Sequence, residues 1–342
     1  MSVNGFDIIG DIHGCALTLE RLLTRLGYTN AQGYFAHPTR RAIFLGDIID
    51  RGPRVREALH LVKNMVDEGA AKCILGNHEY NAVGYTTRVG DGGGSNTCGN
   101  TAGNTSDNTC DHENTPVYVR PHTEHNKRLI SETLAQFASY PEEWRMFLNW
   151  FRTLPLFIEF DDFRVVHACW DQFFVDKLLV KNLFSDGGAS TIDEAFVLAS
   201  ANKGSFEAKA LERLARGTDL YLPEGRSIKS NDGITRRSFR TKFWVENPQT
   251  YSDVIFQPDP LPDDLMNRPL ADVERERLVY YSEKEKPLFV GHYWLKGKPV
   301  RQAKNIACLD YSAVKYGCLV AYRFDGEQEI DNDKFVWEEV NP

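Results

Sequence analysis

Five short apolar runs in this sequence each end in a small cluster of polar residues. The clearest is Ala42–Leu45, which is followed by G-D-I-I-D-R-G-P over Gly46–Pro53. A short apolar run closed by glycine is typical of a buried parallel strand, so Asp47 and Asp50 are expected in the loop at its carboxyl end. In open α/β sheets, ligands bind at that end. The chain is therefore predicted to be an α/β protein with its site at the strand ends.

Four further runs repeat this pattern. Their polar residues are Asp11 and His13 after Phe6–Ile9, Asn77 and His78 after Ala71–Leu75, His167 after Val165–Val166, and His292 after Leu288–Gly291. Because the carboxyl ends of parallel strands share one edge of a sheet, these side chains are predicted to lie close together in one parallel sheet. A lone histidine on an apolar strand is more often a core residue, and Asp50-Arg51 alone could be a solvated turn. It is the five clusters together that favour a site.

The residue types in these clusters suit both a cation and an anion. Asp47 is a candidate metal ligand, Arg51 a candidate phosphate clamp and Asp50 a carboxylate that orients a neighbour. Carboxylate, imidazole and one amide oxygen match Mn, Fe, Zn, Co or Ni better than a cysteine-rich site would. We therefore expect two divalent metal ions, with Mn as the first choice.

The pattern resembles the calcineurin-like metallophosphoesterases, and in particular their phosphoprotein-phosphatase branch, whose blocks are GDxHG, GDxxDRG, GNHE and two later histidines. All five blocks occur in order between Gly10 and His292. The N-terminal third is also similar to bacterial dinucleoside tetraphosphatases, through Asp7–Cys15 and the leucine-rich helix that ends in Leu26-Gly27-Tyr28. The resemblance implies an α/β fold, a two-sheet α/β/β/α sandwich with a helical and hairpin cover.

The resemblance also implies a role for each matched residue. Six would hold the two metal ions, with Asp47 as the bridge: Asp11 and His13 on the first ion, and Asn77, His167 and His292 on the second. Three would act on the substrate: His78 would protonate the leaving oxygen, Asp50 would orient His78 and keep it protonated, and Arg51 would bind the phosphate, together with Asn77. The residues after His167 depart from the family pattern, because Ala168-Cys169-Trp170 replaces small glycines and implies a different wall beside the second ion.

The implied activity is hydrolysis of phosphate esters by a water that bridges the two ions. Its substrates would be serine, threonine or tyrosine phosphoproteins, or small phosphorylated molecules. One alternative is hydrolysis of dinucleoside polyphosphates such as diadenosine tetraphosphate. Another is a binding protein that kept the fold without activity, which would lack a ligand residue, and none is missing here.

The remaining segments are read as parts of one domain over residues 1–342. The expected packing elements are helices at 17–26, 55–66, 130–150 with a break at Pro141, and 192–214, and a hairpin at 156–168. Three C-terminal strands, Asn305–Tyr311, Cys318–Phe324 and Phe335–Val340, are assigned to a second sheet layer. Residues 171–285 are expected to elaborate the cover over the substrate.

Two segments outside the motifs carry further expectations. Residues 90–115 are rich in Gly, Asn, Thr and Ser, which predicts a flexible surface insertion, with a lid over the metal site as the alternative. Residues 226–240 read as a basic hairpin that turns at Asn231-Asp232-Gly233. Arg236 and Arg240 have even spacing, so they would share a face, and one is predicted to bind the phosphate. The alternative is a solvated basic face.

The net charge of −8 argues against general nucleic-acid binding, because phosphate backbones require clustered Lys and Arg. A bound metal pair would still attract a small phosphorylated substrate. No signal peptide and no membrane helix are expected, since no apolar run approaches about 18 residues. The seven cysteines lack paired spacing, which favours free thiols and a cytoplasmic protein.

Overall fold

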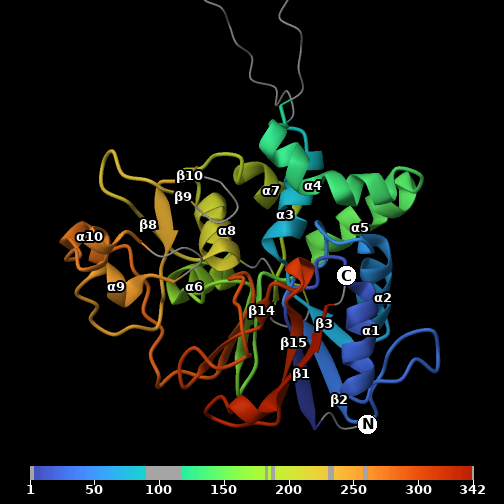
Figure 1. Cartoon of the computed structure of the whole chain (residues 1–342). Helices are drawn as coiled ribbons and strands as arrows, with labels where there is room; N and C mark the ends of the chain where they lie inside the picture. The colour runs from blue at the N-terminus through green and yellow to red at the C-terminus, as the bar shows by residue number, and fades with distance from the viewer. Residues whose placement is uncertain are drawn as a thin grey trace, which may run out of the picture.

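The computed structural model describes residues 4–89, 117–181, 184–185, 189–229, 235–256 and 261–340. Two β-sheets lie at its centre (Figure 1). The first has the strand order β14-β15-β1-β2-β3, and β16 pairs with β15. Its strands are β1 (Gly5–Ile9), β2 (Arg40–Phe44), β3 (Ala71–Cys73), β14 (Asp310–Tyr311), β15 (Cys318–Phe324) and β16 (Phe335–Glu339). β1, β2 and β3 run parallel, as the sequence predicted.

The second sheet has the order β13-β12-β5-β4. Its strands are β4 (Phe157–Glu159), β5 (Arg164–Val166), β12 (Leu288–Val290) and β13 (Ile306–Cys308). β5, β12 and β13 run parallel. β4 pairs antiparallel with β5, which confirms the predicted hairpin.

Aromatic side chains fill the space between the two sheets. The ring of Phe163 lies 5.3 Å from that of Phe6 and 4.5 Å from that of Phe324. Phe289 of the second sheet lies 5.0 Å from Tyr322 of the first. Rings at these separations pack edge to face or tilted, and their burial holds the sheets face to face. The two-sheet sandwich is thus confirmed.

Helices cover the outer faces of both sheets. They are α1 (Ala16–Arg25), α2 (Val55–Asp67), α3 (Asn77–Thr86), α4 (Glu124–Phe137), α5 (Pro141–Thr153), α6 (Gln172–Val180), α7 (Glu194–Ala199) and α8 (Phe206–Arg216). α1 and α2 lie against the first sheet, while α6 and α8 lie on the opposite side of the molecule (Figure 1). Pro141 occupies the first turn of α5 and separates it from α4, as predicted. Among the described residues, no helix has the length and apolarity to cross a membrane.

The C-terminal strands correct the predicted division of the sheets. Only β13 joins the second sheet, whereas β14, β15 and β16 extend the first. β15 pairs antiparallel with β1, from Phe6 opposite Phe324 to Ile9 opposite Ala321. Conversely, the strands that precede His167 and His292 belong to the second sheet, not to one parallel sheet with β1. Pairing between the two ends of a chain is a tertiary property that the local apolar pattern does not encode.

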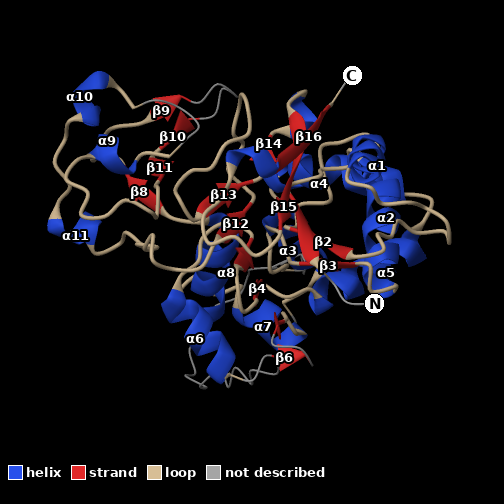
Figure 2. Cartoon of the chain, turned by 90° about the horizontal axis from the view of Figure 1, so that it is seen from below, coloured by secondary structure: helices blue, strands red, loops and turns tan. Residues whose placement is uncertain are grey.

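The cover lies to one side of the two sheets (Figure 2). Its elements are β8 (Asp219–Tyr221), β9 (Ile228–Lys229), β10 (Thr235–Arg236), β11 (Ser238–Arg240), α9 (Tyr251–Val254), α10 (Asp263–Met266) and α11 (Asp272–Arg275). Leu220, Phe239 and Tyr251 belong to an apolar cluster of its own. Elsewhere, β6 (Phe184–Ser185) pairs with β7 (Ala189–Ser190), and two 3₁₀ helices span Ala313–Lys315 and Asn332–Lys334.

The basic hairpin differs in part from the prediction. β9 and β10 pair antiparallel, with Arg236 opposite Ile228, while the predicted turn at 231–233 lies outside the described residues. Arg240 instead lies on β11, which pairs with β8 and places Arg240 opposite Asp219. Arg236 and Arg240 therefore do not share a face of one regular strand, because the chain changes partner between β10 and β11.

The predicted insertion at 90–115 lies outside the described residues, but its stem is described. The N–H of Val89 donates to the carbonyl of Val117 (2.8 Å), and the N–H of Val119 donates to that of Thr87 (3.0 Å). The stem is therefore closed by its own backbone hydrogen bonds. Replacing residues 90–116 with a short Gly-Ser linker should shift the Tm by no more than about 3 °C, measured by calorimetry. A larger fall would show that the segment contributes to the core.

Candidate active site

The six predicted ligand residues come together where strands of both sheets end. Asp11 and His13 follow β1, Asp47 follows β2, Asn77 follows β3, His167 follows β5, and His292 follows β12. None of them is more than 8% exposed. Three have a left-handed backbone, with φ of 44° at His13, 49° at Asp47 and 72° at His292. Backbone conformations of this kind cluster at functional sites, where they direct side chains toward positions that a regular strand cannot reach.

Asp47 is the centre of the cluster. Its Oδ2 lies 3.7 Å from Nε2 of His13, 3.4 Å from Nε2 of His167 and 3.9 Å from Nε2 of His78. Two groups with metal-ligand spacing result, one of Asp47 with His13 and His78 and the other of Asp47 with His167 and His292. Both groups share Asp47, as a ligand that bridges two cations must.

Asn77 completes the second group. Its Oδ1 lies 3.2 Å from Nε2 of His167 and 2.7 Å from Nδ1 of His292. The amide oxygen, the two imidazoles and Asp47 thus converge on one point. The arrangement is the one expected for the second metal site.

Backbone carbonyls fix the orientation of two imidazoles. Nδ1 of His13 lies 2.7 Å from the carbonyl oxygen of Ile49, and Nδ1 of His167 lies 2.6 Å from that of Leu45. A carbonyl can only accept, so Nδ1 carries a proton in each ring and Nε2 is the nitrogen that is directed at the site. Such outer hydrogen bonds are typical of metal-binding histidines.

Asp11 belongs to neither group. Its carboxylate accepts the backbone N–H of His292 at 3.1 Å, and a side chain at Gly291 would collide with it. Burial, aided by the nearby carboxylate of Asp310, raises the pKa of Asp11 well above its ordinary value. A cation beside Asp11 would stabilise the ionised carboxylate and so offset the cost of burying it. Its role as a ligand of the first metal ion stays a prediction.

The imidazoles around Asp47 stabilise the negative charge of its carboxylate. Burial disfavours its carboxylate, but the imidazoles of His167 and His78 hold the pKa of Asp47 well below the ordinary range. Burial likewise opposes a charged His167, yet Asp47 raises the pKa of His167 to about 10. A buried carboxylate among imidazoles stays ionised, as a metal ligand must.

The donor set fits divalent cations. Nε2 of His292 is buried and has no hydrogen-bond partner within the part of the chain that the structure describes. An unpartnered buried nitrogen is costly unless a ligand uses it. Together with carboxylates and an amide oxygen, these imidazoles suit Mn, Fe, Zn, Co or Ni rather than Ca or a thiolate-bound ion.

Glu79 organises the loops that carry the ligands, and sequence reasoning gave it no role. Its buried carboxylate accepts four backbone N–H groups, those of Asp47 (2.8 Å), Ile48 (2.8 Å), Ile49 (3.2 Å) and Gly76 (3.2 Å). It thereby joins the loop after β2 to the loop after β3. The available signal was its place as the last residue of Gly-Asn-His-Glu.

His78 and Asp50 form a buried pair beside Asp47. Nδ1 of His78 lies 2.6 Å from Oδ2 of Asp50, whose other oxygen accepts the hydroxyl of Thr133 at 2.5 Å. Burial lowers the pKa of His78 to about 3 and raises the pKa of Asp50 to about 7. This differs from the expectation that Asp50 keeps His78 protonated, because burial outweighs the carboxylate. A bound phosphate would favour the imidazolium, since a nearby negative charge raises a histidine pKa.

Arg51 lies at the edge of the cluster of predicted ligands. Its Nη1 donates to Nε2 of His13 at 2.9 Å, and its Cζ lies 4.0 Å from the ring centroid of Trp294. Nζ of Lys315 lies 4.0 Å from the same ring, so two cations contact the indole. Cation–π contacts hold a guanidinium without neutralising it, which leaves Arg51 free to pair with an anion.

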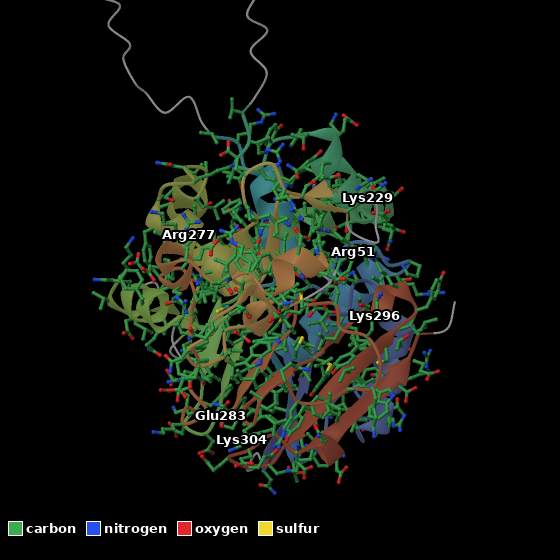
Figure 3. The ribbon with its side chains drawn as sticks, turned by 60° about the vertical axis from the view of Figure 1, so that its left-hand side comes forward. Arg51, Lys229, Arg277, Glu283, Lys296 and Lys304 are labelled. Carbon is green, nitrogen blue, oxygen red and sulfur yellow. The ribbon has the colours of Figure 1, made fainter. Side chains whose placement is uncertain are left out.

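A cavity of about 1360 Å³ opens beside the cluster. The cationic side chains in its wall are those of Arg51, Arg120, Arg216, Arg236, Arg237, Arg240, Lys296, Lys298 and Lys315. Three acidic side chains, Glu212, Asp219 and Glu339, also line it. Figure 3 shows Arg51 with Lys296 and the cover residue Lys229 on the same side of the molecule. The cavity is therefore cationic, although the chain carries a net charge of −8.

The two predicted hairpin arginines both line this cavity. Nη1 of Arg240 lies 3.4 Å from the carbonyl oxygen of His292, close to the cluster of predicted ligands. Arg216, which the sequence reading missed, donates from Nη2 to Oδ1 of Asn81 at 2.7 Å. It ends a helix that was expected only to pack, so no local signal marked it. Ala168, Cys169 and Trp170 are buried and do not line the cavity, and the different wall expected beside the second ion stays a prediction.

Comparisons with known proteins identify the family of the chain. The model of a family described as calcineurin-like phosphoesterase matches residues 6–222. Bis(5'-nucleosyl)-tetraphosphatase PrpE of Halalkalibacterium halodurans is 46% identical over 74 residues, which are 21% of this chain and 30% of that protein. Its counterpart in Oceanobacillus iheyensis is 49% identical over 73 residues, 21% and 29% of the two chains. The matched segment thus spans less than a third of these relatives.

Solved structures also resemble the whole chain at low identity. One is a protein serine/threonine phosphatase from Saccharomyces cerevisiae with similarity to human phosphatase PP5, at 11% identity and a TM-score of 0.47, covering 98% of this chain and 79% of that one. Another is the cold-active protein-tyrosine phosphatase of a Shewanella species, at 14% identity and a TM-score of 0.44, covering 99% and 81%.

Proposed function

The chain belongs to the calcineurin-like phosphoesterase family, and from this premise we propose that it hydrolyses phosphate esters in a site that takes two divalent cations. The observation that carries the proposal is Asp47, a buried carboxylate shared by two groups of ligand spacing. When bound, the cations would neutralise phosphoryl oxygens and make a water nucleophilic at neutral pH. His78, Asp50 and Arg51 would supply the rest of the chemistry.

His78 is proposed to give a proton to the leaving oxygen. It lies in the same buried cluster as Asp47, and Asp50 orients its ring through the 2.6 Å contact at Nδ1. Nε2, the other ring nitrogen, faces the cluster and is the atom that would deliver the proton. Arg51 would hold the phosphate, because a planar guanidinium can form two parallel hydrogen bonds with phosphate oxygens.

The proposed substrates are phosphoproteins carrying phosphoserine, phosphothreonine or phosphotyrosine. Dinucleoside polyphosphates are the second candidate, and two observations favour it. The N-terminal segment is similar to bis(5'-nucleosyl)-tetraphosphatases. The cavity of about 1360 Å³ is lined by more cations than one phosphate requires. A binding protein without activity is disfavoured, because none of the six predicted ligand residues is missing.

One experiment separates these substrates. Purified protein with added Mn would be assayed on phosphoserine and phosphotyrosine peptides, diadenosine tetraphosphate and p-nitrophenyl phosphate. The highest kcat/KM should fall on a peptide if the first proposal holds, and on the dinucleotide if the second does. No turnover of any of the four substrates would contradict both.

Arg240 is proposed to bind the substrate phosphate, with Arg236 as the other predicted candidate. Arg240→Ala should lower kcat/KM about 10-fold or more, the scale of one charge-assisted contact. Arg226→Ala is the matched control, because Arg226 belongs to the same basic segment at 226–240, pairs with Asp264 at 2.8 Å and does not line the cavity. If Arg236→Ala, Arg240→Ala and the control all behave like wild type, the hairpin is a solvated basic face.

A further inference from the structure

One wall of the cavity holds two arginines, Arg120 and Arg216, and Glu212 is the acidic residue that lines the cavity beside Arg216. Arg120 follows the stem of the 90–116 segment, and Arg216 ends α8. Both lie against α3: the N–H of Arg120 donates to the carbonyl of Gly84 at 2.9 Å, and Nη2 of Arg216 donates to Oδ1 of Asn81 at 2.7 Å. The packing on one helix therefore fixes both residues on the same wall.

Arg120 lacks a partner that would neutralise it. Across the described ranges, no hydrogen bond or ion pair joins its guanidinium to another residue. The nearest acid to Arg216 is Glu212, whose carboxylate is 3.8 Å away and 66% exposed. Burial and the charge of Arg216 together lower the pKa of Arg120 to about 10. Two guanidinium groups in one partly buried wall repel each other, and an anion bound in the cavity would offset that repulsion.

Other partly buried arginines of this fold form ion pairs with carboxylates. Arg40 pairs with Asp7 at 3.0 Å, and Arg164 pairs with Glu159 at 2.9 Å and Glu285 at 2.7 Å. The chain thus supplies carboxylates where an arginine only supports the fold. Arg120 differs in that it lines a cavity and has no such carboxylate, which is the arrangement of a site for an anionic ligand.

Helix α3 relates the position of Arg120 and Arg216 to the proposed reaction centre. This helix begins at Asn77 and His78 in the metal cluster. At about 1.5 Å of rise per residue, the contacts at Asn81 and Gly84 lie about 5 to 9 Å beyond His78 along the helix axis. The long arginine side chains would extend from these contacts to a phosphate joined to the reacting phosphate through one or two bridging oxygens.

We propose that Arg120 and Arg216 form a subsite for a second phosphate of the same substrate, so that the enzyme favours di- and polyphosphate chains over single phosphate esters. The inference rests on the proposed function and favours its second substrate candidate, the dinucleoside polyphosphates. The planar fork of a guanidinium suits tetrahedral phosphate oxygens, and two forks can hold one phosphate from two sides. Arg120 contacts only the distal group and leaves the reacting phosphate to Arg51.

The test compares Arg120→Gln with wild type on diadenosine tetraphosphate and p-nitrophenyl phosphate, with Mn in excess. The variant should lose about 10-fold or more in kcat/KM on the dinucleotide and change less than about twofold on the single phosphate. Arg88→Gln is the matched control. Arg88 lies across the same stem, opposite Tyr118, is exposed and does not line the cavity, so both values should be unchanged.

Calorimetric binding gives a second readout that needs no turnover. Arg120→Gln should weaken the Kd of methylenediphosphonate about 10-fold and leave that of methylphosphonate unchanged. Equal losses for both ligands, or none for either, would overturn the subsite. A loss confined to an acidic phosphoserine peptide would overturn it in favour of a carboxylate contact. If wild type hydrolyses neither substrate, the proposed function fails, while the binding comparison still decides the subsite.

Discussion

Asp47→Asn should reduce kcat/KM at least about 100-fold and lower the amount of bound metal. Loss of a residue that merely supports a metal ligand costs about 10–100-fold, and Asp47 would contact both ions directly. The change removes one charge and keeps the shape of the side chain. The amide oxygen can still accept the N–H of His78, which now donates to Oδ1 of Asp47 at 2.9 Å, so the fold should persist.

Metal content by mass spectrometry and steady-state kinetics would be measured together for this variant. Asp162→Asn is the matched control, because Asp162 is exposed in the turn between β4 and β5, away from the cluster. It should retain full activity and full metal content. An Asp47→Asn protein that binds two ions and turns over normally would remove Asp47 as the bridge.

The second large effect is expected at His78. His78→Asn should lower kcat about 10²–10⁴-fold while metal content falls little, since this is the usual contribution of a general acid. The loss should be smaller for p-nitrophenyl phosphate than for an alkyl phosphate, because a good leaving group needs no proton. Both substrates would be assayed in parallel with the variant and the wild type.

His60→Asn serves as the control for the loss of an imidazole. His60 lies on α2 and contacts Glu143 at 3.1 Å, outside the cluster and its cavity. It should leave both rates unchanged. Equal losses for the phenolic and the alkyl substrate in His78→Asn would assign His78 a structural role, through its contact with Asp50.

The ligand cluster could be read from the sequence because each member directly follows a short apolar run. Asp47 and Asn77 are fixed by local chain geometry, since a strand that ends in glycine places the next side chains at the sheet edge. The pairing of the strands was harder to predict from the sequence. β15 joins β1 through contacts between the two ends of the chain, and no local period reports such a choice of partner.

The cavity wall was predicted only in part. Arg240 was found because it stands in a basic run, although the strand that carries it pairs with β8 and not within the expected hairpin. Arg120 and Arg216 have ordinary neighbours in the sequence. Only the packing of both on α3 places them together, and that packing is a tertiary property. Glu79 shows the same limit, because its four backbone partners come from two different loops.

Metal titration of the wild-type protein tests the central claim most directly. Chelation should abolish hydrolysis of p-nitrophenyl phosphate, and Mn added to the stripped protein should restore it in proportion to occupancy, with full activity at about two ions per chain. Metal content and rate would be measured on the same samples. Full activity in protein shown to be free of metal, or saturation at a single ion, would contradict a site built around a bridging Asp47.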